Sequence, residues 1–124
     1  MPVERAMTAY TQERLNCAQS VLRGFQHRHT ISEEQIVDAR RHGGGRAEEG
    51  MCGALYAALS LVDDPPVRER VRADFTKSVG SEKCREIKRD MRIPCHECVR
   101  LAASLLAEHT PVPAALQPSK EVQT

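Results

Sequence analysis

The chain has 124 residues, which suits one domain with a hydrophobic core of limited size. Its 18 basic residues nearly balance 17 acidic ones, and it contains two Tyr, two Phe and no Trp. This composition argues against nucleic acid as a partner, because it offers neither a basic excess nor an aromatic surface for stacking bases. The first sixteen residues are amphipathic, include charged side chains and lack the apolar core of a signal peptide. No segment is long and apolar enough to cross a membrane. We therefore expect a soluble, cytoplasmic protein.

The first half of the chain predicts helices. Apolar residues at steps of seven, four and four place Cys17 in the middle of a helical run between Tyr10 and Phe25. The sequence Ser-Glu-Glu-Gln at 32–35 is a capping box that opens a short helix, which the glycines after it bring to an end. A further apolar face at helical spacing covers residues 51–62.

The second half predicts further helices, each opened by a cap or a proline. The predicted boundaries are Asp64 with Pro65, Gly80 as a stop, Ser81 as a cap, and Pro94. The apolar faces that follow these starts carry Val67, Val71, Phe75 and Val79, then Cys84, Ile87 and Met91, then Cys98, Ala102 and Leu105.

No stretch shows the alternation of a β-strand or the turn of a hairpin, and the chain has no internal repeat. The predicted fold is an all-α, single-domain bundle of five or six short helices over residues 1–109. Residues 110–124 hold three prolines and little periodicity, so we expect a disordered tail there.

Five cysteines are many for a chain of this size. In a reducing compartment a cysteine cluster indicates a metal or redox site more than a disulfide framework. Cys52, Cys84 and Cys98 each fall within about one turn of a predicted helix start, where backbone amides and the helix dipole favour a thiolate. We therefore expect a shared site, although cysteine also serves as a small core residue. Cys17 joins that site only if the bundle folds its apolar face against the three helix starts.

Cys95 and Cys98 form a C-x-x-C sequence, which has three common interpretations. A thioredoxin-like motif needs a strand–helix–strand context, and a zinc knuckle needs a second C-x-x-C. A c-type haem site needs a histidine where Val99 stands. None of the three fits, so one or both cysteines are expected to act with distant partners.

A glycine-rich loop precedes and surrounds Cys52. A phosphate-binding loop would need a lysine and a hydroxyl residue after its last glycine and a strand before it, and the sequence has neither. The glycines are predicted to let the backbone turn sharply and to leave room beside Cys52, and their amides favour an anion such as a thiolate or the sulfurs of a cluster. These loop residues are Gly43, Gly44, Gly45, Gly50 and Gly53.

The cysteine order resembles a known family. Cys17, then GMCGALYA, then Cys84 and CHECVRLAA resemble the C-GCAxxG-C-C family of redox-active proteins. The likeness spans most of the chain, from Asn16 into the helix after Cys98. The last glycine of the family motif aligns with Ala57, and Cys95 lies outside the four-cysteine pattern.

The resemblance implies a small redox-linked protein. A more distant similarity to the cysteine-bearing part of split-Soret cytochromes implies a 2Fe–2S cluster held by Cys17, Cys52, Cys84 and Cys98, with Cys95 as an alternative ligand. Two alternatives stay open: a metal-free thiol–disulfide protein that uses Cys95 and Cys98 or a pair formed across the bundle, and a helical interaction module stabilised by zinc. Whether the chain is an enzyme, which protein exchanges electrons with it, and whether it forms a homodimer also stay open.

Overall fold

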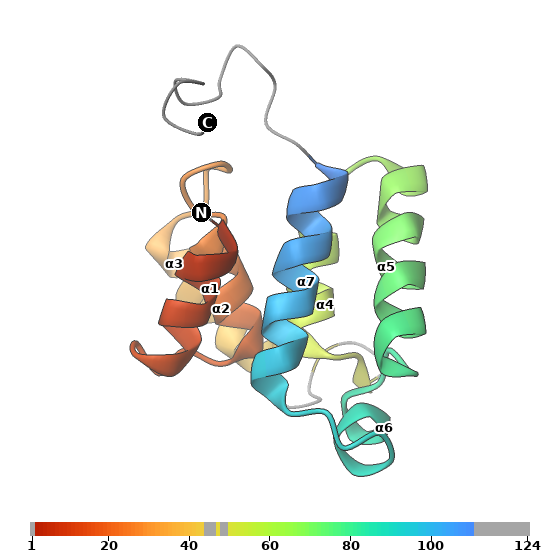
Figure 1. Cartoon of the computed structure of the whole chain (residues 1–124). Coiled ribbons are helices and arrows are strands. Elements are labelled where there is room, and N and C mark those ends of the chain that lie inside the picture. Colours follow the sequence, from red (N-terminus) through yellow and green to blue (C-terminus); the bar gives the residue numbers. More distant parts are fainter. Residues whose placement is uncertain (1, 44–46, 48–49, 111–124) are drawn as a thin grey trace, which may run out of the picture.

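The computed structural model describes residues 2–43, 47 and 50–110, so that Gly44, Gly45 and residues 111–124 of the predicted tail lie outside the described residues. Within these ranges the chain forms α-helices and one 3₁₀ turn, with no strand beyond a single isolated bridge (Figure 1). The predicted all-α, single-domain fold is confirmed. The elements are α1 (Pro2–Thr11), α2 (Cys17–Gly24), α3 (Glu33–Asp38), the 3₁₀ turn η1 (Ala39–His42), α4 (Gly53–Ser60), α5 (Pro65–Val79), α6 (Cys84–Arg89) and α7 (Cys95–His109).

The described residues hold seven α-helices where five or six were predicted, because the first predicted run is two helices. Asn16 caps α2: its side chain accepts the Gln19 N–H at 2.9 Å, and the Gln19 side chain accepts the Asn16 N–H at 3.1 Å. Arg14, in the connection, has a φ of 59°, which a right-handed helix does not accommodate. Cys17 is therefore the first residue of α2, and its predicted place in mid-helix was wrong.

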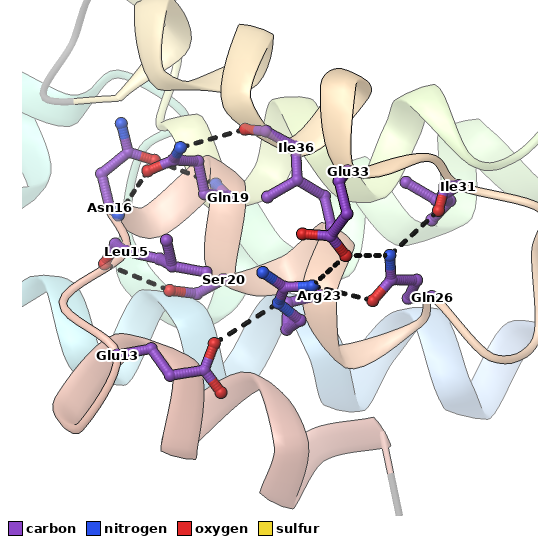
Figure 2. Close-up of polar contacts among 10 residues, drawn as sticks. All are labelled: Glu13, Leu15, Asn16, Gln19, Ser20, Arg23, Gln26, Ile31, Glu33 and Ile36. Atoms are coloured by element: carbon purple, nitrogen blue, oxygen red, sulfur yellow. Dashed lines mark hydrogen bonds and ion pairs between the residues drawn. The ribbon is translucent and has the colours of Figure 1, made fainter.

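Side chains of α2 tie this helix to its neighbours (Figure 2). The Arg23 guanidinium lies 2.5 Å from a Glu33 carboxylate oxygen on α3 and 3.4 Å from Glu13, just after α1. Near the start of α2, the buried Gln19 side chain donates to the Ile36 carbonyl of α3 at 3.0 Å. These contacts fix the orientation of α2 and therefore the position of Cys17, its first residue.

The longest helices meet at the centre of the bundle. Helix α7 contacts α1, α2, α4 and α5, and α2 also contacts α1 and α4 (Figure 1). Large apolar side chains from most elements are fully buried between them, which stabilises the arrangement. They are Phe25, Phe75, Ile36, Leu55, Ile87, Leu106, Val21, Val71 and Val99. Among the described helices, none is both long enough and apolar enough to span a membrane.

Several predicted helix boundaries are confirmed. Ser32 caps α3 in a reciprocal capping box with the side chain of Gln35. Asp64 is the N-cap residue of α5 and is followed by proline at the first helical positions. Gly80 ends α5 in the left-handed conformation, with a φ of 87°, and Pro94 stands directly before α7.

The predicted start of α6 was wrong by two residues. The N-cap residue is Lys83 and not Ser81. The Ser81 hydroxyl accepts the Lys83 N–H at 3.0 Å and donates to Glu86 at 2.6 Å, so it forms a turn before the helix begins. Met91 was predicted on the buried face of this helix, but α6 ends at Arg89 and Met91 is 48% exposed.

Candidate metal and redox centre

The cysteines gather around one small cavity. Its volume is about 10 Å³, and all five thiols line it together with Ile87 and Lys88. All five cysteines lie within the described residues, and none is in a disulfide. Four are buried, and Cys95 is partly exposed. The fold therefore brings together the four predicted site cysteines, Cys17, Cys52, Cys84 and Cys98, and adds Cys95 to them.

Four helix starts supply these thiols. Cys17, Cys84 and Cys95 are the first residues of α2, α6 and α7. Cys52 is the N-cap residue of α4, and Cys98 follows Cys95 by one turn of α7. Unpaired backbone amides and the positive end of the helix dipole lie at such positions. The cavity therefore sits where several helix starts favour negative charge.

A short backbone bridge holds two of the segments together. The Cys52 N–H donates to the Glu82 carbonyl at 2.7 Å, and Met51 and Lys83 form an isolated antiparallel bridge. Because Cys84 follows this bridge directly, the bridge fixes the distance between the start of α4 and the start of α6.

The described loop glycines allow close approach and a sharp turn. A Cβ at Gly53 would lie 2.6 Å from the His42 carbonyl oxygen and 2.7 Å from the Cys17 sulfur, and a Cβ at Gly43 would overlap the Asn16 side chain. Gly50 has a φ of 76°, a conformation that glycine adopts without strain. Gly53 was predicted to leave room beside Cys52, whereas the sulfur that its missing side chain leaves room for is that of Cys17.

The electrostatics of Cys52 differ from expectation. A helix start was expected to lower the pKa of this thiol, but its pKa is raised. The Cys52 thiol is hydrogen-bonded to the Cys98 sulfur and is buried, and both effects disfavour the thiolate. The amides of Ala54 and Leu55 face the Cys52 sulfur and favour the thiolate, but they are outweighed. They do not form a regular cap hydrogen bond with it.

The pKa of Cys84 is also raised. Burial is the main cause, and the neighbouring Cys52 and Cys95 thiols add to it. Lys88 acts in the opposite direction, because its positive charge favours a thiolate. The hydrogen bond to Cys98 at Cys52, and burial at both Cys52 and Cys84, therefore raise the pKa of these thiols and favour their protonated form.

Cys95 has polar partners that the sequence did not reveal. The Tyr10 hydroxyl of α1 and the Lys88 ammonium of α6 are hydrogen-bond partners of the Cys95 sulfur. Lys88 follows Cys84 by four residues and so shares its helix face, a signal available in the sequence. No local pattern points to Tyr10, which is far from Cys95 in the chain.

The donor atoms suit a soft metal centre. Thiols are the ligands preferred by zinc, copper(I) and iron–sulfur clusters, and no carboxylate or imidazole is among the described residues that line the cavity. Within the described part of the chain, however, no three His, Cys, Asp or Glu side chains already stand at metal-binding spacing. The number and kind of donors therefore fit, and binding requires the thiols to turn toward a common centre.

A protein-family model described as "Putative redox-active protein (C_GCAxxG_C_C)" matches residues 15–109. The chain belongs to the C-GCAxxG-C-C family. The matched region begins just before Cys17 and ends with the last residue of α7, so it contains all five cysteines. Comparison with curated proteins and with solved structures returned no match.

Proposed function

We propose that this member of the redox-active C-GCAxxG-C-C family binds an iron–sulfur cluster, of the two-iron, two-sulfur type, through Cys17, Cys52, Cys84 and Cys98. In this role it transfers single electrons to and from a partner protein in the cytoplasm, or it acts as a redox sensor. The observation that carries the proposal is the convergence of four buried thiols, from four separate helix starts, on one cavity. Four thiolates are the usual ligand set of such clusters.

The residues around the thiols support this role in three ways. Burial keeps water away from the sulfurs, and the amides of Ala54 and Leu55 face the Cys52 sulfur as donors. The positive charge of Lys88 offsets part of the negative charge of nearby thiolates. A bound cluster supplies one-electron transfer. The cavity has room for about one water molecule, so the cysteine side chains would have to move apart to admit a cluster between them.

The test is anaerobic reconstitution of the reduced full-length protein with iron and sulfide. We expect visible absorption bands, with about two irons and two sulfides per chain. Cys52→Ser should lose most of the absorption and the iron, whereas Cys95→Ser, at the same cavity, should keep both. A protein that stays colourless and iron-free after this treatment would contradict the proposal. Stoichiometric zinc in the protein as purified, with no redox-active signal, would favour the structural-zinc alternative.

A metal-free thiol–disulfide function is the second candidate, and the hydrogen bond between Cys52 and Cys98 favours it. Oxidation of this pair by a disulfide substrate would form one bond between the two sulfurs and break the substrate's S–S bond. Two electrons and two protons would pass to the two thiols released. Mass spectrometry after mild oxidation with a small disulfide should then find one defined, reversible Cys52–Cys98 bond. Oxidation scattered over many pairs would count against this candidate.

A further inference from the structure

Cys95 differs from the other four cysteines in its exposure and in its partners. It is the partly exposed thiol of the cavity, while the other four are buried. It stands at the first position of the fifteen-residue helix α7. Lys88 and Tyr10 approach its sulfur from two other helices. Cys95 therefore connects the thiol cavity to the protein surface.

The segment that carries Lys88 has more exposed basic than acidic side chains. From Cys84 to Arg92 the chain carries four basic residues and two acidic ones, and all six are exposed. The basic residues are Arg85, Lys88, Arg89 and Arg92, and the acidic ones are Glu86 and Asp90. Of these residues only Lys88 lines the cavity with Cys95, and the partly exposed Glu97, two residues after Cys95, carries the opposite charge. A small anion that approaches Cys95 from the side of Lys88 meets a favourable field.

We propose that Cys95 is a site of S-thiolation by small anionic disulfides. The Cys95 sulfur attacks one sulfur of the disulfide, a new S–S bond joins Cys95 to half of the reagent, and the reagent's own S–S bond breaks. The proton of the Cys95 thiol ends on the thiol that leaves, so the step needs no other oxidant. Lys88 stabilises the negative charge that passes along the three sulfurs during the exchange.

This inference does not rest on the proposed cluster, because Cys95 is not one of the four proposed ligands. Metal content and Cys95 modification are separate measurements on the same protein. A protein without iron whose Cys95 is modified would contradict the proposed function alone. A loaded protein whose Cys95 resists modification would contradict this inference alone.

The first experiment treats the reduced full-length protein with glutathione disulfide, at neutral pH and low ionic strength. We expect one glutathione adduct per chain, located on Cys95 by peptide mapping and reversed by dithiothreitol. Cys95→Ser should remove this adduct. A first adduct on any of the buried cysteines, or an unchanged adduct in Cys95→Ser, would overturn the proposal.

The second experiment tests the charge at the mouth of the cavity. Lys88→Gln is compared with Arg89→Gln, which removes the same charge from the next residue of α6, and both side chains are exposed. We expect Lys88→Gln to slow the reaction with glutathione disulfide about three- to tenfold, and Arg89→Gln by less than about twofold. With cystamine, a cationic disulfide, the decrease in reaction rate caused by Lys88→Gln should be smaller. Equal rates in the two variants, or equal losses with both disulfides, would overturn the role of Lys88 and the preference for anions.

Discussion

The tight contact at Gly53 gives the sharpest test of how the thiol cavity is built. In Gly53→Ala, the new Cβ would stand 2.6 Å from the His42 carbonyl oxygen and 2.7 Å from the Cys17 sulfur. Overpacking of this kind costs about 1–3 kcal/mol. Little of this is regained through helix propensity, because Gly53 is the first residue of α4 and not an interior one. We therefore expect a net loss of about 1–3 kcal/mol in the free energy of unfolding.

Urea unfolding of the reduced protein measures this loss, and the rate of Cys17 alkylation by iodoacetamide measures the local displacement. Ala57→Gly is the matched control, because it changes a buried position of the same helix and lowers stability without adding an atom near Cys17. It costs about 1 kcal/mol through helix propensity and about 0.8 kcal/mol through the lost buried methyl group. Gly53→Ala should speed Cys17 alkylation more than Ala57→Gly does at similar stability. If Gly53→Ala is as stable as the native protein, or leaves Cys17 alkylation unchanged, the close approach of α4 to Cys17 is not a constraint on the fold.

Three further predictions concern the scaffold. Asn16→Ala removes the cap of α2 and should cost about 1 kcal/mol and speed Cys17 alkylation, whereas Ser32→Ala, which removes the similar cap of α3, should lower stability without that effect. Phe75→Ala empties a fully buried site and should cost about 3–5 kcal/mol by urea unfolding, in contrast to a cost below about 1 kcal/mol if α5 packs loosely. Burial and a neighbouring arginine lower the pKa of His29, so the fold favours the neutral ring and its stability falls as pH drops below about 6.5. His29→Gln should reduce this loss between pH 7 and pH 5, and an unchanged pH profile would refute the assignment to this histidine.

Much of the fold could be predicted because helix boundaries carry local chemical signals. The Ser32 capping box, the Asp64 cap and the left-handed Gly80 all occupy their predicted places. The break before Cys17 was missed, although Asn16 and Gln19 form the same kind of capping box. The apolar repeat continues across the break because α1 and α2 both pack against the same core, and this continuity concealed the local signal.

The candidate site was predictable to the extent that it depends on helix starts. The sequence correctly predicted that Cys52, Cys84 and Cys98 stand near helix starts. Cys17 also stands at a helix start, which the missed cap at Asn16 would have revealed. The direction of the pKa shifts was not predictable in this way. A helix start acts on a thiol through a few local amides, whereas burial and neighbouring thiols depend on segments far apart in the chain.

The same distinction explains why the role of Cys95 required the structure. Its sequence neighbourhood shows only a C-x-x-C, whereas its two polar partners come from α1 and α6. Four thiols are buried by the packing of the bundle, and the fifth is left at the surface beside a lysine. The start of α7 therefore supplies the cavity with two thiols of different exposure, the partly exposed Cys95 at its first position and the buried Cys98 one turn further along.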